Sequence, residues 1–99
     1  MRVNAEMGLI PIGTGVSISE YVAACVKVFR EAGLEVQLHA NGTNVEGEWD
    51  AVMAAVRRCH EVVHGLGAPR INTTLKLNTR TDRDQGLTET VRRVEQHLS

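Results

Sequence analysis

The order in which two hydrophobic periodicities alternate along these 99 residues limits the folds that this chain can adopt. Apolar residues at every second position indicate a strand with one buried face, and a repeat near 3.6 indicates an amphipathic helix. The two-residue period occupies residues 3–10, 34–40, 42–49 and 70–79. The helical period occupies residues 17–33, 49–65 and 87–98. The predicted order is therefore strand, helix, strand, strand, helix, strand and a closing helix.

Local signals place several of the predicted boundaries. Ser17 and Glu20 have the S-x-x-E spacing of a capping box, so we expect the first helix to begin there. Gly33 supplies the left-handed residue that commonly ends a helix. The pair Asn41–Gly42 is a strong signal for a tight hairpin between the second and third strands.

This order predicts an α+β fold, a ferredoxin-like sandwich with an extra C-terminal helix. Right-handed crossovers around a central hairpin give an antiparallel sheet with strand order 4-1-3-2. We expect one domain over residues 1–99, with its two principal helices on one face of the sheet. That face is predicted to bury Val3, Ala5, Met7, Val36, Leu38, Val45, Ile71, Leu75 and Leu77.

Composition argues against several classes of partner. Eleven Lys and Arg residues against twelve Asp and Glu give no overall field for nucleic acid or an anionic membrane. The central strands also lack the exposed aromatics of a sheet that binds RNA. We find neither a signal segment nor a run of about 18 apolar residues, and therefore expect a cytoplasmic protein without a membrane span.

The sequence does not favour catalysis, a metal site or a bound cofactor. Cys25 and Cys59 lie in helical patterns without ligand spacing, so buried free thiols are expected. His60 and His64 are four residues apart but lack the H-E-x-x-H context, which predicts a surface pair. The glycine-containing stretch 11–19 and the first N–H groups of the helix could receive an anion such as phosphate or sulfate, but the stretch lacks a phosphate-loop spacing, which favours turn and cap chemistry. No nucleophile with a matching base is recognisable, so an enzyme is not expected.

The sheet face opposite the helices carries the polar positions of the strands. Glu6 and Glu46 should lie near its middle, because the first and third strands are the central pair. Their predicted neighbours are Gln37, His39, Asn44, Thr74 and Lys76. This face is either a solvated surface or a polar cavity enclosed by a second copy of the chain, which a domain this small would gain from. Two carboxylates, a histidine and several hydroxyl and amide groups offer many acceptors against the single obvious cation, Lys76, so such a cavity would favour a cationic or amide-rich ligand.

Three separated segments resemble the small thiamine-binding protein family. They read EMGLIPIGTGVSISEYVA, NGTNVEGEWDAVM and GAPRINTTLKLNTRTDR, and the resemblance runs from Val3 to the closing helix. It implies a βαββαβ fold that associates as dimers of dimers. It also implies a site for thiamine or its hydroxymethylpyrimidine half, and no enzymatic activity. Family members usually have P-M-G-T at the hairpin, where residues 40–43 here read ANGT. Any contact that the family's methionine makes with a ligand is therefore not expected in this chain.

Combined with the open face, the resemblance gives a predicted ligand site. Glu6 and Glu46 would hold a protonated aminopyrimidine and the thiazolium charge of thiamine. The other predicted site residues are Ser19, Thr43, Asn44, Thr74 and Lys76. Tyr21 is either a ring beside the ligand or an aromatic of the core or interface. The competing hypotheses are a structural or regulatory homo-oligomeric module without a ligand and, with less support, an enzyme acting on a small cationic substrate.

Overall fold

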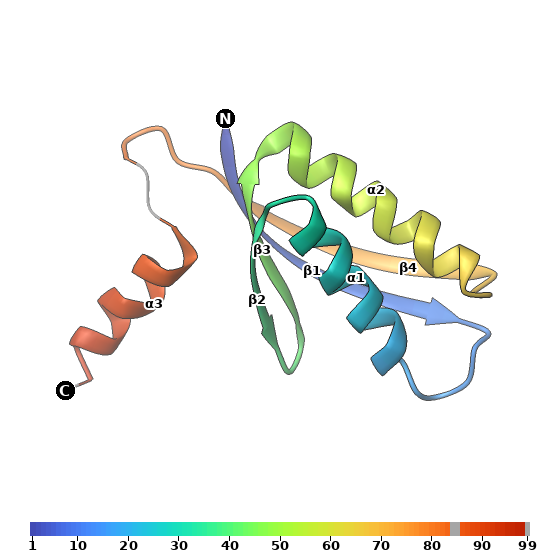
Figure 1. Cartoon of the computed structure of the whole chain (residues 1–99). Coiled ribbons are helices and arrows are strands. Elements are labelled where there is room, and N and C mark those ends of the chain that lie inside the picture. The colour runs from blue at the N-terminus through green and yellow to red at the C-terminus, as the bar shows by residue number, and fades with distance from the viewer. Residues whose placement is uncertain (84–85, 99) are drawn as a thin grey trace.

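The computed structural model describes residues 1–83 and 86–98 and contains the predicted elements in the predicted order. They are β1 (Arg2–Ile12), α1 (Ser19–Glu31), β2 (Glu35–His39), β3 (Gly42–Glu48), α2 (Trp49–Gly65), β4 (Arg70–Asn78) and α3 (Leu87–Gln96) (Figure 1). The strands pair antiparallel in the order β2-β3-β1-β4, which is 4-1-3-2 read from the other edge. The prediction of a ferredoxin-like sandwich is thus confirmed.

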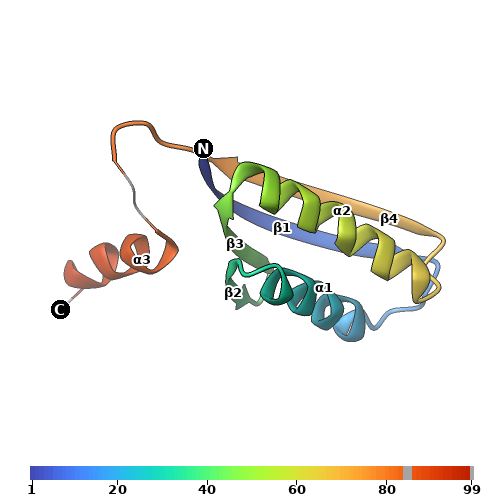
Figure 2. The same cartoon turned by 45° about the horizontal axis from the view of Figure 1, so that its top comes forward.

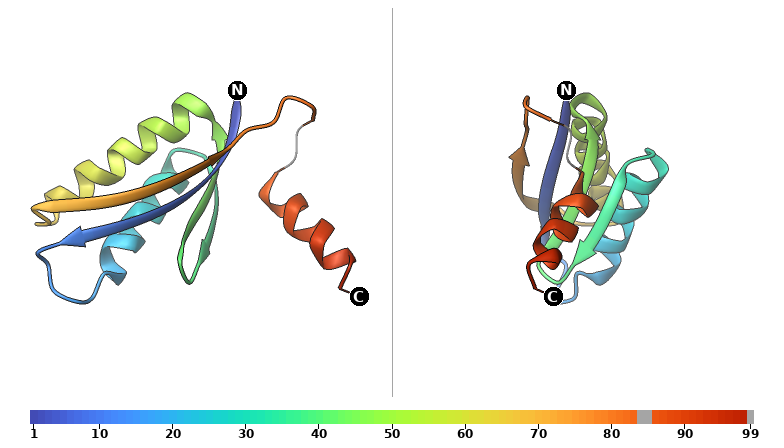
Figure 3. Two further views of the ribbon diagram at one scale, coloured as in Figure 1. Left: turned by 180° about the vertical axis from the view of Figure 1, so that it is seen from behind. Right: turned by 90° about the vertical axis from the view of Figure 1, so that its left-hand side faces the viewer.

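Both principal helices lie on one side of the sheet, and the other side has no helical cover. Figure 2 shows α1 and α2 side by side over the strands, and the view from behind in Figure 3 shows β1 and β4 uncovered. Alternation along β1 separates the two sides, since Val3, Ala5 and Met7 are buried while Glu6 and Ile10 are exposed. We call the uncovered side the open face.

The helix-covered side holds the hydrophobic core, which is centred on Phe29, a residue of α1 with no exposed surface. Most of the predicted core is correct, but two residues of it are wrong. Leu38 is 61% exposed and Leu77 is 40% exposed. Both lie on edge strands, β2 and β4, where neighbouring structure covers only one flank of a side chain. Periodicity predicted correctly that both side chains point to the helix-covered side. It does not show how far α1 and α2 extend over that side.

The first helix does not begin with the predicted capping box. The N-cap of α1 is Ile18, and no side chain bonds the first backbone N–H groups. Because the helix starts at Ser19, Ser17 lies outside it and Glu20 falls in its first turn. There the negative charge of Glu20 still interacts favourably with the helix dipole.

The β2–β3 hairpin is present, but its turn differs from the predicted one. His39 pairs with Gly42, so the two turn residues are Ala40 and Asn41 and the glycine begins β3. Among the described residues only glycines have positive φ, and Gly42 is not one of them. The physical reason for this glycine is close packing: a Cβ there would lie 3.1 Å from the Met7 carbonyl oxygen.

The C-terminal helix forms as predicted; its first residue, Leu87, contacts the open face, whereas its later apolar residues are exposed. It projects away from the two layers in Figures 1 and 2 and in the left-hand view of Figure 3. Val91, Val94 and Leu98 are 47%, 59% and 80% exposed. Of the helices in the described part of the chain, none is long and apolar enough to cross a membrane.

Candidate functional site

Five of the seven predicted site residues share the open face. Glu6, on β1, lies between Asn44 of β3 and Lys76 of β4 in the strand register. By the same alternation Glu46 and Thr74 also point to this side. The inner strands therefore place both carboxylates on the side without helices.

Thr43 and Ser19 lie elsewhere. Thr43 pairs with Met7, points to the helix-covered side and is only 3% exposed. Neighbouring residues of a strand point to opposite faces, so Thr43 and Asn44 cannot serve one surface. Ser19 is an exposed residue at the start of α1, on the helical layer. The seven residues thus do not form a single site.

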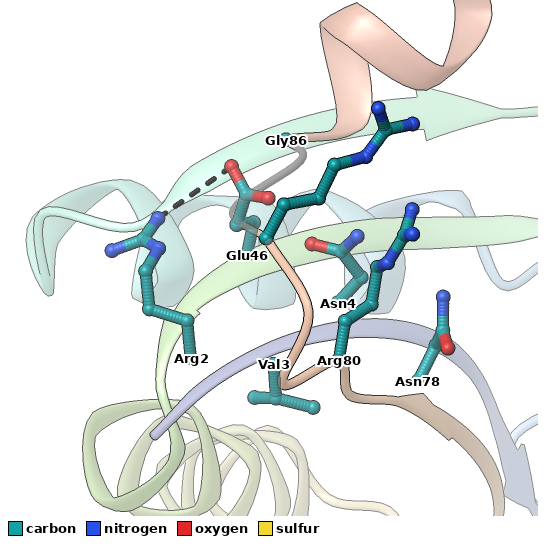
Figure 4. Close-up of a pocket in the computed structure, with 8 residues that line it drawn as sticks. Arg2, Val3, Asn4, Glu46, Asn78, Arg80 and Gly86 are labelled. Atoms are coloured by element: carbon teal, nitrogen blue, oxygen red, sulfur yellow. Dashed lines mark ion pairs between the residues drawn. The ribbon is translucent and has the colours of Figure 1, made fainter.

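Glu46 is buried although it lies on the open face, because Arg2, Gly86 and Leu87 lie against it. Its side chain is 7% exposed, and one carboxylate oxygen lies 3.6 Å from the Arg2 guanidinium (Figure 4). It also accepts a hydrogen bond from the backbone of Leu87, the first residue of α3. A Cβ on Gly86 would approach the same carboxylate to 3.0 Å. Glu46 therefore occupies the N-terminus of α3, which has no cap from its own side chains.

The surroundings of Glu46 raise the pKa of its carboxyl group. Burial is the largest cause, followed by a hydrogen bond with the Glu35 carboxyl and repulsion from that group. The Arg2 charge and the Leu87 bond act in the opposite direction but are smaller. The carboxylate oxygens of Glu46 already interact with Arg2, Leu87 and Glu35, so few of their hydrogen-bonding positions are available to a ligand.

Beside Glu46 the open face has a hollow of about 140 Å³ whose charge differs from the expectation. Arg2, Arg80 and Arg83 line it together with Glu46, so cations outnumber carboxylates there. Arg80 is held by Asp82, whose pKa the guanidinium lowers to about 2. The sequence argument missed these arginines because Arg2 precedes the predicted first strand and the others lie in a predicted loop. This hollow is not the acidic cavity that was predicted.

Glu6 is the carboxylate that remains accessible. Its side chain is 48% exposed, and its Oε2 lies 3.2 Å from Nε2 of His39. The contact has the distance of an ion pair without the angle of a directed hydrogen bond. Next to the Glu6–His39 pair, the absent side chain of Gly42 leaves the imidazole room above the strand.

A second cavity, of about 240 Å³, lies between α1 and the tip of the hairpin; we call it the α1–hairpin pocket. Its walls are largely apolar and come from β1, α1 and β2. The apolar side chains lining it include Met7, Leu9, Ile18, Val22 and Leu38. Thr43 and His39 supply polar atoms. A mostly apolar pocket with a few polar groups is the usual form of a small-molecule site.

The floor of this pocket is a length of β1 with one strand neighbour. β1 pairs with β3 only as far as Met7 and Thr43, whereas it pairs with β4 on to Ile12. Gly8, Leu9 and Ile10 line the pocket just beyond the end of that pairing. A strand edge without a partner strand presents backbone N–H and C=O groups side by side. The sequence did not predict this feature, because the expected first and third strands, residues 3–10 and 42–49, are equally long, whereas the observed β1 is longer than β3.

The histidines and cysteines that the sequence analysis did not assign to a site, and Tyr21, make contacts within the fold. His60 Nε2 lies 2.7 Å from Thr73 Oγ1, and His64 Nδ1 lies 2.8 Å from the Ala68 carbonyl oxygen. Within the described residues no three His, Cys, Asp or Glu side chains gather as metal ligands would. Cys25 and Cys59 are free and buried as predicted. Tyr21 belongs to the core, with 6% of its surface exposed.

Comparison with known proteins identifies the group to which this sequence is related. A family model described as thiamine-binding protein matches residues 5–95. A UPF0045 protein of Synechocystis is 54% identical over 98 residues, covering 99% of this chain and 81% of its own. A UPF0045 protein of Eremothecium gossypii is 42% identical over 100 residues, covering 100% of this chain and 95% of its own.

Solved structures share the fold. The crystal structure of a hypothetical protein from Methanocaldococcus jannaschii superposes with a TM-score of 0.88 at 31% identity, over 95% of this chain and 96% of the other. A Thermotoga maritima protein described as a putative thiamine biosynthesis/salvage protein has a TM-score of 0.81 at 17% identity, over 95% and 99% of the two chains. The family match extends over nearly the whole sequence, so the chain belongs to the thiamine-binding protein family.

Proposed function

We propose that this chain is a cytoplasmic, non-enzymatic protein that binds thiamine or its hydroxymethylpyrimidine half and assembles as a homo-oligomer, a dimer of dimers, through its open face. Family membership over residues 5–95 supports the ligand class. The free, buried Cys25 and Cys59 suit a reducing compartment.

The observation that carries the proposal is the α1–hairpin pocket with its strand edge. An aminopyrimidine has a ring nitrogen that accepts and an exocyclic amine that donates, side by side. The backbone N–H and C=O of Leu9 offer the complementary groups at the end of the β1–β3 pairing, because the groups of successive residues point to opposite edges and those of Gly8 and Ile10 face β4. Apolar side chains such as Val22 and Leu38 would contact the flat faces of the ring. Thr43 would add one hydroxyl within the pocket.

The thiazolium charge of thiamine would be held near the pocket by Glu6. This carboxylate is half exposed and contacts His39, which itself lines the pocket. Attraction to a nearby carboxylate applies to thiamine but not to the uncharged alcohol of hydroxymethylpyrimidine. Glu6 should therefore discriminate between the two ligands, while the pocket should hold the ring that they share.

Calorimetric titration with thiamine and with hydroxymethylpyrimidine tests the proposal. Glu6→Gln should weaken thiamine binding about tenfold, the effect of losing about 1.4 kcal/mol, and leave hydroxymethylpyrimidine unchanged. Val22→Trp should fill the pocket and remove binding of both ligands. Glu61→Gln, an exposed carboxylate of α2, is the matched control and should change neither. An absence of heat from both ligands at high micromolar concentration would contradict the proposal.

A structural or regulatory oligomer without a ligand is the second candidate. Two observations favour it: Glu46 is engaged by Arg2 and α3, and the open face exposes Ile10 and Ile12. On this view the double variant Glu6→Gln, Glu46→Gln changes the molar mass of the oligomer measured by light scattering. Calorimetry detects no heat of ligand binding with the unmodified protein. Ligand heat that disappears in Val22→Trp, with the mass unchanged, would exclude it.

A further inference from the structure

We propose that Cys25 is a site of reversible thiol oxidation in the wall of the α1–hairpin pocket, and that Cys59 converts the oxidised thiol to a disulfide. The oxidant is a small peroxide that enters the pocket. The pocket serves here as an access route, whichever ligand binds in it, so the oxidation site lies beyond the proposed function. Neither thiol is used by the ligand site described above.

The two cysteines belong to the two helices that cover the sheet. Cys25 lies on α1 and Cys59 on α2, and these helices pack directly against each other (Figure 2). The Cys59 Sγ lies 3.9 Å from the backbone carbonyl oxygen of Cys25, and the two thiols share a hydrogen bond. A disulfide requires two cysteines on neighbouring backbone segments with their side chains directed at each other. The packing of α1 on α2 supplies this arrangement.

The two thiols differ in their access to a cavity. Cys25 lines the α1–hairpin pocket, three residues after Val22 and on the same side of α1. Cys59 has no exposed surface and does not line this pocket. The pocket volume of about 240 Å³ is ample for hydrogen peroxide. A peroxide that enters from solvent therefore meets Cys25 first.

The electrostatics of the pair favour the same order. The hydrogen bond with Cys59 lowers the pKa of the Cys25 thiol, although burial opposes this shift. The same bond raises the pKa of Cys59, and burial raises it further. The thiolate is the form of cysteine that attacks an oxidant. Cys25 is therefore the nucleophile, and Cys59 keeps its proton during the first step.

The oxidation takes two steps. The Cys25 thiolate attacks one peroxide oxygen: an S–O bond forms, the O–O bond breaks, and the leaving hydroxide takes up the proton that Cys25 had lost. This gives water and a sulfenic acid on Cys25. The Cys59 sulfur then attacks the Cys25 sulfur: an S–S bond forms, the S–O bond breaks, and the Cys59 proton leaves with the hydroxyl group as a second water. The two thiols lose two electrons, which the peroxide gains.

The disulfide would connect both sides of the pocket and could be reversed. The chain between the two cysteines contains β2 and β3, so the bond closes a covalent ring that includes the hairpin. The hairpin and α1 are the facing sides of the pocket. Cytoplasmic disulfides are usually transient, because thiol reductants such as glutathione exchange with them. In the compartment proposed above, the oxidised form would therefore last only while peroxide is present.

Peptide mapping after treatment with hydrogen peroxide tests the site. Trypsin cleaves after Lys27 and Arg58, which places the two cysteines in different peptides. The folded native protein should yield these peptides joined by a disulfide that dithiothreitol releases. Cys59→Ala should instead accumulate sulfenic acid on Cys25, which dimedone labels once the chain is denatured. Cys25→Ala should leave Cys59 unmodified, because that thiol does not border the pocket.

Filling the pocket tests the access route. Val22→Trp should slow disulfide formation by about tenfold or more, since oxidation follows the exposure of the thiol. Val16→Trp is the matched control, at a fully exposed residue outside the pocket, and should leave the rate unchanged. If Val22→Trp does not fold, the two alanine variants still decide which thiol reacts first.

Four results would overturn the inference. They are unmodified cysteines in the peroxide-treated native protein, a disulfide between two chains instead of within one, oxidation of Cys59 in Cys25→Ala, and an unchanged rate in folded Val22→Trp. The last result would mean that peroxide reaches the thiols only when the whole chain unfolds.

Discussion

The helix-covered side and the open face are made by the same four strands but are closed to very different degrees. On the covered side Phe29, Val45 and Val52 have no exposed surface. On the open face Glu6 remains half exposed and Ile10 is more than half exposed, while Glu46 is buried against Gly86 and Leu87. The chain completes one side locally with α1 and α2 and leaves most of the other to a distant segment or a second molecule.

Two carboxylates of one face illustrate the difference. Glu46 is shielded, holds the N-terminus of α3 and contacts Arg2. Glu6 contacts His39 at the surface. Position on a strand therefore determines which side a carboxylate faces, whereas the tail of the chain determines whether it serves the fold or is accessible to a ligand.

The largest expected effect lies on the covered side. Phe29→Ala should lower the free energy of unfolding by about 3–5 kcal/mol, since it removes a fully buried ring. Thr74→Ala on the open face is the control, and should change it by less than about 0.5 kcal/mol. Urea denaturation measures both, and similar losses would show that the two sides are equally closed.

A smaller effect is expected where the tail covers the open face. Glu46→Ala should cost about 1 kcal/mol, the usual contribution of an N-cap, because Leu87 loses its acceptor. Hydrogen exchange should become faster at the Leu87 amide and throughout α3. Glu48→Ala, an exposed carboxylate of the same strand, should leave α3 unchanged. Unaltered exchange in Glu46→Ala would mean that the carboxylate does not hold the helix.

The pH dependence of stability should reflect the pair of Glu46 and Glu35. Burial and the Glu35 carboxyl raise the pKa of Glu46, so the folded state binds this proton more tightly than the unfolded state does. Its contribution is complete below the ordinary value of 4.5 and is lost as the pH rises through the higher folded value. Glu35→Gln should reduce this loss in urea titrations at several pH values. A variant with the same pH profile as the native chain would contradict the assignment.

The smallest effect on stability is expected at Glu6. Glu6→Gln should change the free energy of unfolding by less than about 0.5 kcal/mol, because a surface ion pair contributes little and Glu6 is half exposed. Thermal unfolding in low and high salt measures the change. A loss as large as that of Glu46→Ala would mean that Glu6 also has a structural role, and would weaken its assignment to a ligand.

The sequence by itself determined the element order and the strand order, and it placed Glu6 and Glu46 away from the helices. These features follow from local periodicity and from the handedness of short connections. The same alternation already separated Thr43 from Asn44, although both were assigned to one site. The resemblance of three segments to the thiamine-binding family was likewise recognisable from the sequence alone.

Tertiary structure alone decided what surrounds those residues. Glu46 meets Leu87 and Arg2 from opposite ends of the chain, and the pocket exists because β1 continues beyond the hairpin. Leu38 is exposed because the helical cover ends before it. Periodicity reports which way a side chain points, but burial and charge depend on segments far away in sequence, and no local pattern records where these segments lie.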